Sequence, residues 1–338
     1  MMKKTAIALG IAALACGAQA AEVFKNADTA IEVNADLQFY NLNVVDTASA
    51  QARNYIQGIG TQIQFKASKI IDDDLTVFGQ IEFDPDPVGD NATVLTDDMK
   101  FGLKSKTWGT IQVGQFDTYM EDELMEIANS FVLSGYAGLV TEPTAGNDGR
   151  HILWKHTFGG LGVGVDFTTS ANAASASTDA QNGIAYTVSY TMGDLKLVAG
   201  TSTIARYKTD TYASQSTDAA TGIGASYSLT TGAGLTKFAF LSATNTSYST
   251  TAAYDGLDTK FNMISVVHNY GPWQLGVITS SRDIPQLSSS AAAAVYQETG
   301  VQVVYDLGKG ARLYVANSNM GLTTGLGNFT EVGFVMSF

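Results

Sequence analysis

Apolar and polar side chains alternate one by one along much of the chain, in runs of about ten residues. In the first run, the apolar face comprises Ile31, Val33, Ala35, Leu37 and Phe39. The opposite face comprises Glu32, Asn34, Asp36, Gln38 and Tyr40. A period of two is typical of a β-strand with two unlike faces, so the pattern predicts an all-β protein.

The polar face of these strands distinguishes between two all-β architectures. A soluble sandwich exposes a charged face, whereas here the polar face is rich in Gln, Asn, Ser, Thr and Gly. Charged residues make up 15% of the chain, against about 25% in typical globular proteins. Such a face suits a water-filled lumen, while lipid covers the apolar side. Because all backbone groups in lipid must be paired, the strands are predicted to close into a transmembrane antiparallel β-barrel.

Turn-forming residues divide the chain into a meander with alternating short and long connections. Short turns are predicted at residues 71–74, 106–109, 159–160, 192–194, 232–234, 270–272 and 308–310. Longer polar connections are predicted at residues 169–182, 207–221, 245–259 and 283–294. Outer-membrane barrels have short periplasmic turns and long external loops. The strands between these marks number about sixteen, a barrel size that leaves an aqueous channel.

The first twenty residues have the features of an export signal. Two lysines precede a short apolar stretch, and Ala18-Gln19-Ala20 matches the small-x-small cleavage site. The apolar stretch is shorter than the roughly 20 residues that a membrane-spanning helix needs. We therefore predict cleavage between Ala20 and Ala21. Residues 1–20 would be removed, and residues 21–338 would form a single barrel domain.

Composition argues against several classes of function. The only cysteine, Cys16, lies inside the predicted signal, so the exported chain has no disulfide, cysteine-ligated zinc or cysteine nucleophile. The net charge of −13 argues against nucleic-acid binding, which calls for clustered Lys and Arg. The only histidines are His151, His156 and His268, and neither a Gly-x-Ser-x-Gly motif nor a transition-metal ligand pattern accompanies them. The sequence therefore predicts no enzyme, no cofactor and no metal site.

Three segments resemble one known family. Residues 21–25 (AEVFK) resemble the mature start of general diffusion porins of Gram-negative bacteria. Residues 109–118 (GTIQVGQFDT) resemble that family's fifth strand running into its third loop. Residues 332–338 (VGFVMSF) resemble its final strand, which the barrel-insertion machinery reads as an assembly signal. Here that signal would consist of Phe334, Met336 and Phe338.

Together with the export signal and the repeated strands, this resemblance covers essentially the whole chain. It implies a trimer of barrels, each of about sixteen strands and each enclosing its own pore. It also implies a location in the outer membrane, among its lipid and lipopolysaccharide. By resemblance, then, the chain would be a homotrimeric channel for the passive diffusion of small hydrophilic solutes and ions.

The longest break in the alternation spans residues 117–149. Long loops tend to be functional, and in the porin family the third loop folds into the barrel and narrows it. This resemblance makes five residues candidates for the acidic side of a constriction: Asp117, Glu121, Asp122, Glu123 and Glu126. The alternative is a solvated external helix without contact with the pore. The loop lacks the Pro-Glu-Phe-Gly tip that is usual in the family.

The alternation also identifies residues that would line the pore wall. On the early strands these are Gln62, Lys66, Gln80, Glu82, Lys100 and Lys104. The sequence shows no evident arginine cluster to face the acidic loop. Because a ring of carboxylates in a narrow channel favours cations, we predict a preference for cations.

Two other kinds of barrel are compatible with this pattern. A sugar-specific channel would need aromatic side chains along the lumen, and Tyr40 and Phe78 fall on the inward register. A plugged, purely structural barrel would have the same strands but no conductance. A phosphate channel is disfavoured, because it would need a ladder of arginines and the exported chain has few.

Overall fold

The computed structural model describes residues 21–46, 51–57, 61–85, 94–128, 150–169, 180–207, 215–247, 257–284, 294–321 and 326–337. The predicted export signal with Ala20, residues 129–149 of the predicted constriction loop and Phe338 lie outside these parts. The first elements are β1 (Ala21–Lys25), β2 (Thr29–Asp46), β3 (Gln51–Gln57), β4 (Gln62–Ile70), β5 (Leu75–Pro85), β6 (Val94–Ser105), β7 (Gly109–Gln115), α2 (Tyr119–Glu123) and the 3-10 helix η1 (Met125–Ile127). They are followed by β8 (Arg150–Phe158), β9 (Leu161–Thr169), β10 (Ala180–Met192), β11 (Leu195–Tyr207), β12 (Gln215–Thr231), β13 (Gly234–Ser247), β14 (Leu257–Tyr270), β15 (Trp273–Ile284), β16 (Ala294–Gly308), β17 (Ala311–Gly321) and β18 (Leu326–Ser337).

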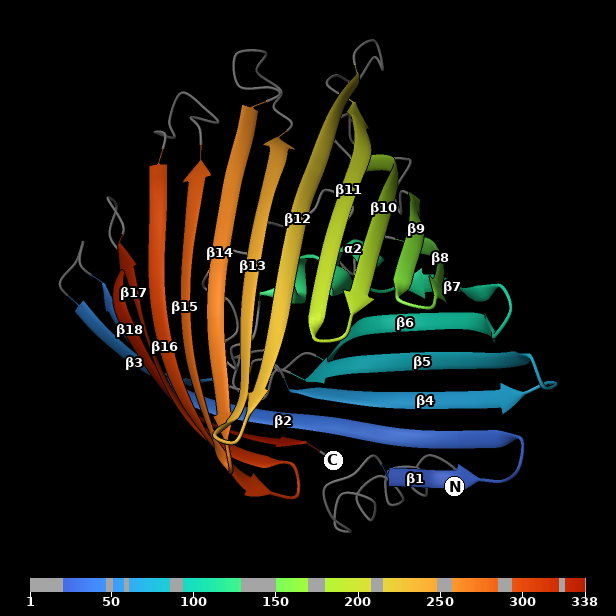
Figure 1. Ribbon diagram of the computed structural model, residues 1–338, viewed down its shortest axis with the longest axis horizontal. Helices are drawn as coiled ribbons and strands as arrows, with labels where there is room; N and C mark the ends of the chain where they lie inside the picture. The colour runs from blue at the N-terminus through green and yellow to red at the C-terminus, as the bar shows by residue number, and fades with distance from the viewer. Residues whose placement is uncertain are drawn as a thin grey trace.

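These strands form one antiparallel sheet that closes on itself where β18 pairs with β2. β3 and β4 share one position in the wall, because they pair with the two halves of the same edge of β2. β1 and β18 share another position along the opposite edge of β2. Figure 1 shows this arrangement, with β4 on one side of β2 and β1 on the other. The wall therefore has sixteen positions, and the predicted fold is confirmed.

All seven predicted short turns connect consecutive strands, and six of them contain a glycine that helps the chain to reverse tightly. Gly159, Gly193 and Gly271 have φ values of 62°, 57° and 55°, each as the first residue of a two-residue turn. A type II′ turn needs a positive φ at this position, and it matches the twist of the flanking strands. The sequence spacing of these glycines therefore sets the register of the hairpins.

Several long connections are shorter than predicted, because the strands on either side extend into them. Gln215–Thr221 belongs to β12, although its side chains are small or polar. Strand pairing continues there with β11. Thr201 and Thr221 are exposed and share a hydrogen bond between their hydroxyl oxygens at 3.1 Å. The strand ends that extend into these connections lack the alternation of apolar and polar residues, because the barrel wall continues beyond the apolar part of its outer surface.

Outside and inside of the barrel follow the predicted alternation. Phe65, Ile81 and Phe101 lie side by side on β4, β5 and β6 and are 46%, 40% and 55% exposed. Their sequence neighbours Lys66 and Gln80 point to the inside. The outer surface is thus a continuous apolar face that needs lipid around it. Within the described residues, no helix is both long and apolar enough to span a bilayer.

Aromatic side chains gather beside the short turns on this outer surface. Trp108, Phe158, Tyr190, Tyr270 and Trp273 are all exposed there. Rings with one apolar body and one polar tip favour the depth of the lipid headgroups. This end of the barrel therefore carries an aromatic girdle.

Candidate pore constriction

The chain leaves β7 and enters a helical segment inside the barrel. The Thr118 hydroxyl caps α2 by accepting a hydrogen bond from the Glu121 backbone N–H at 3.2 Å. α2 contacts β9, β10 and β11, and η1 contacts β12 and β13. In Figure 1, α2 lies within the ring of strands, behind β10 and β11. The described part of the loop, up to Ala128, therefore lies against one inner wall instead of projecting into solvent.

Apolar side chains fix this loop to the wall. Met120, Leu124 and Ile127 are buried in a cluster with wall residues that include Leu241 and Phe261. Burying side chains of this kind stabilises a contact by about 1.5–3 kcal/mol each. The acidic residues of α2 therefore share a short helix with an apolar anchor.

Glycines in the wall make room for the anchor. A Cβ atom at Gly164 would lie 2.1 Å from the ring of Tyr119, and one at Gly200 would lie 2.9 Å from Met120. A Cβ atom at Gly224 would lie 2.7 Å from Ile127. Any side chain at these three positions would collide with the loop. The glycines on β9, β11 and β12 thus mark the loop's footprint.

A buried polar pair supports the start of the loop. Nδ1 of His151 lies 3.0 Å from an oxygen of Asp166, and both residues are buried. The ring of Phe116 packs against His151 with centroids 5.3 Å apart. Phe116 and Tyr119 also bury the inward-facing Leu153. His151 therefore contributes packing and a hydrogen bond at the start of the loop.

The five candidate acidic residues do not share one environment. Asp117, Asp122 and Glu126 are exposed, and Glu121 is partly buried. Glu123 forms an ion pair with Lys196 of β11 at 2.9 Å. Three carboxylates are thus accessible to water and ions, while a fourth is neutralised by a wall lysine.

Glu121 differs from its neighbours in its protonation. Burial, followed by repulsion from Asp117, Glu126 and Asp122, raises the pKa of the Glu121 carboxyl to about 7. The charge of the nearby His151 ring acts in the opposite direction but is a smaller effect. One oxygen of Glu121 is also buried without a hydrogen-bond partner among the described residues. This carboxyl is therefore half protonated near neutral pH.

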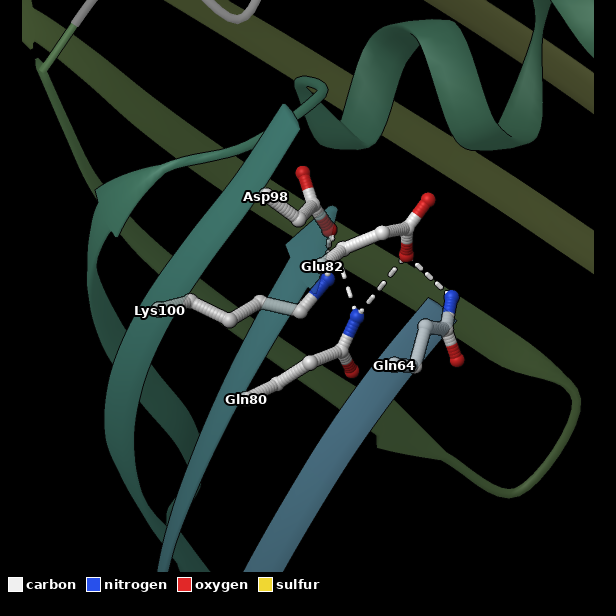
Figure 2. A network of polar contacts seen from close by, with 5 residues as sticks. All are labelled: Gln64, Gln80, Glu82, Asp98 and Lys100. Carbon is white, nitrogen blue, oxygen red and sulfur yellow. Dashed lines mark hydrogen bonds and ion pairs between the residues drawn. The ribbon is translucent and has the colours of Figure 1, made fainter. Parts of the chain in front are cut away.

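On the inner wall, a polar network joins β4, β5 and β6 (Figure 2). Gln64 donates a short hydrogen bond to Glu82, and Gln80 donates weakly to both Glu82 and Asp98. Lys100 forms an ion pair with Asp98 at 2.6 Å. Figure 2 shows these side chains converging, with a helical segment drawn above them. Glu82 and Lys100, both predicted pore-wall residues, therefore belong to one connected group.

Lysines lie beside the base of the loop as well. Nζ of Lys155 lies 5.1 Å from the centre of the Tyr119 ring, and Nζ of Lys100 lies 5.9 Å from that of Phe116. Sequence reasoning identified Lys100 but missed Lys155, Lys196 and Asp98. The available signal was the inward register of β8, in which Lys155 follows His151 and Leu153.

The remaining predicted residues are placed as follows. Gln62, Lys66 and Gln80 are partly buried in β4 and β5, and Lys104 is exposed in β6. Phe334 and Met336 lie in β18, partly buried, and Ala21 begins β1. Among the described residues, no group of acidic, histidine or cysteine side chains is arranged to hold a metal ion.

One curated relative is similar to a limited part of the chain. A monosaccharide porin of Halomonas sp is 32% identical over 133 residues, which are 37% of this chain and 36% of that relative. The chain therefore matches only about a third of the relative's length.

Solved structures and a family model match far more of the chain. OmpF of Salmonella typhi, in complex with daunomycin, has a TM-score of 0.72 at 16% identity, covering 93% of this chain and 99% of that one. An anion-selective porin from Comamonas acidovorans has a TM-score of 0.70 at 14% identity, covering 92% and 100%. At such identities the likeness shows the fold alone. A family model described as Gram-negative porin matches residues 5–321, and the chain therefore belongs to the Gram-negative porin family.

Proposed function

We propose that the chain forms a water-filled channel in the outer membrane, through which small hydrophilic solutes and ions diffuse passively. The observation that carries the proposal is a closed barrel with an apolar outside, a polar inside and a loop bound against one inner wall. The carboxylates of Asp117, Asp122 and Glu126 are exposed, so water reaches the lumen side of the loop. The porin family and its fold are known as channels and not as enzymes.

Cation preference follows from the balance of charges beside the loop. Glu123 is neutralised by Lys196, and Lys100 is neutralised by Asp98. Besides Glu123, the described part of the loop carries four carboxylates, and the wall lysines that act on them, Lys155 and Lys237, are fewer. A narrow passage with excess negative charge attracts cations. The Comamonas porin shares the fold but is anion-selective, so side chains and not the fold must set the sign of the selectivity.

Planar-bilayer recording of the full, purified protein tests both statements. In a potassium chloride gradient we expect stepwise openings and a reversal potential of the sign expected for potassium permeation. Openings in groups of three would support the trimer that the sequence resemblance implies. Correctly folded protein that never conducts would contradict the channel and favour a plugged, structural barrel. Conduction with an anion-directed reversal potential would contradict the cation preference alone.

Cation preference is expected to weaken as the pH falls through neutrality. Since the pKa of Glu121 is raised to about 7, this carboxyl is charged above that pH and neutral below it. The potassium-to-chloride permeability ratio should therefore decrease between about pH 8 and about pH 6, a range in which ordinary carboxyls stay charged. Reversal potentials at each pH measure the ratio. Glu121→Gln should flatten the dependence, and an unchanged slope in that variant would exclude Glu121 as its source.

Assembly and surroundings are part of the same proposal. We infer that the barrel-insertion machinery reads β18 with Phe334 and Met336, and that three barrels associate within outer-membrane lipid and lipopolysaccharide. A sugar-specific channel is the second candidate. It is favoured by the likeness to a monosaccharide porin of Halomonas sp, over the 133 residues that the two chains share.

A further inference from the structure

A cavity of about 180 Å³ opens on the inner wall at β2, β4 and β5. It is distinct from the described part of the loop, whose helices α2 and η1 contact β9 to β13. The side chains that matter for its chemistry are Glu32, Lys66, Ser68, Phe78 and Gln80. Gln80 belongs to the network of Figure 2, and by strand register Glu32 and Lys66 lie beside it, two residues closer to the β4–β5 turn than Gln64 and Glu82.

Strand register places these side chains in two adjacent rows. Glu32, Lys66 and Gln80 are direct partners across β2, β4 and β5. Ser68 and Phe78 are partners in the next row, and Gly102 of β6 follows Phe78 in it. Positions two residues apart along a strand share a face. The cavity thus lies where a row of polar groups meets an aromatic ring.

Gly102 determines how the ring of Phe78 lies. A Cβ atom at position 102 would be 2.5 Å from Cζ of Phe78 and 2.8 Å from Cε1. The ring therefore occupies the space that a side chain on β6 would fill. It is partly exposed, and it borders the cavity. Phe78 thus provides an apolar surface that the backbone of β6 supports from the side.

The polar groups around the cavity are not saturated by one another. Glu32 and Lys66 are direct neighbours in register, yet they form no ion pair within 4.0 Å. Neither side chain has a hydrogen bond to another side chain among the described residues. This contrasts with the adjacent network of Gln64, Glu82 and Lys100, whose groups are joined to one another.

We propose that this cavity is a subsite for one neutral sugar ring, a pyranose, passing along the channel wall. A pyranose has an apolar C–H face that fits the ring of Phe78, and hydroxyls that can both donate and accept hydrogen bonds. Glu32 accepts, Lys66 donates, and Ser68 and Gln80 do both. A free anion or cation would meet one attractive and one repulsive charge. The cavity is smaller than the roughly 300–1,000 Å³ of drug-sized sites, which limits it to a single ring.

The subsite rests on the proposed function, because it requires an open lumen. The experiment records the potassium current of the full protein in planar bilayers while glucose is titrated. We expect saturable reduction of the current by glucose. Phe78→Ala should raise the half-saturating concentration by roughly tenfold, the order of one aromatic contact. Phe78→Trp should keep the binding, and its fluorescence should change as glucose is added.

Two variants separate binding from architecture. Phe101→Leu removes a lipid-facing ring on the neighbouring strand and should leave both conductance and glucose affinity unchanged. Glu32→Gln combined with Lys66→Gln should weaken glucose binding, measured as the fraction of that variant's own potassium current that glucose blocks. Potassium current with no saturable glucose effect would overturn the subsite but leave the channel in place. Block by a zwitterionic amino acid such as glycine, without block by glucose, would also overturn it. A folded barrel that never conducts would overturn both proposals.

Discussion

Unitary conductance is expected to increase by about twofold when Gly200 and Gly224 are both replaced by leucine, because the loop that we propose narrows the pore can no longer pack against the inner wall. A Cβ atom alone at these positions comes within 2.9 Å of Met120 and 2.7 Å of Ile127. Overpacking of this kind costs about 1–3 kcal/mol per site, enough to offset much of the loop's anchoring. The barrel wall itself keeps its backbone pairing between β11 and β12.

Single-channel recording measures this change, together with the size limit of neutral solutes in vesicle-swelling assays. Gly232→Leu is the matched control, since a side chain there would meet nothing within 4 Å. The mobility of unheated protein in a denaturing gel shows whether each variant is a folded barrel. Unchanged conductance in the folded double variant would mean that the loop does not limit the pore.

A reversal of ion preference is expected when Asp122 and Glu126 are both replaced by lysine. Both side chains are exposed, so the new charges act directly on ions in the lumen, although partial burial of the Asp122 carboxyl raises its pKa. One unit charge about 8 Å from an ion in water changes its energy by about 0.5 kcal/mol. Four units of change should therefore shift the potassium-to-chloride permeability ratio by more than about tenfold.

The reversal potential in a potassium chloride gradient measures this shift. Asp73→Lys on the exposed β4–β5 turn adds a similar charge away from the loop and should have a much smaller effect. Replacing Glu121 and Glu123 by lysine as well should lower the potassium-to-chloride permeability ratio further, although it also breaks the Glu123–Lys196 ion pair. A ratio that stays constant through all these variants would remove the loop from the ion path.

The wall of the barrel could be predicted from sequence because lipid and water impose opposite demands on alternate residues. Phe65 next to Lys66, or Phe101 next to Lys100, reveals its orientation without any knowledge of the fold. Turn glycines such as Gly159 mark the strand ends for an equally local reason, their positive φ. These features determine the strand count.

The loop footprint could not be predicted in the same way, because it depends on contacts between distant parts of the chain. On β14, Phe261 and Met263 point inward and are buried, while Ile264 faces outward. A strand with apolar residues on both faces has no clear alternation. The role of Gly200 and Gly224 likewise becomes evident only from the structure, in which Met120 and Ile127 lie over them. The same dependence explains why Lys155 and Lys196 were missed.

The shared wall position of β1 and β18 has a consequence for how the molecule is made. β2 lies near the start of the chain and pairs along one edge with both chain ends, so this seam can form only after the final strand has been synthesised and exported. Gln38 and Tyr314, which hydrogen-bond across the seam, are 276 positions apart in sequence. Loop closure over such distances is slow, and until it happens two strand edges remain unpaired, which lipid does not tolerate. A chain truncated before β18 would therefore keep an open strand edge. Closure at this seam thus distinguishes complete chains from truncated ones.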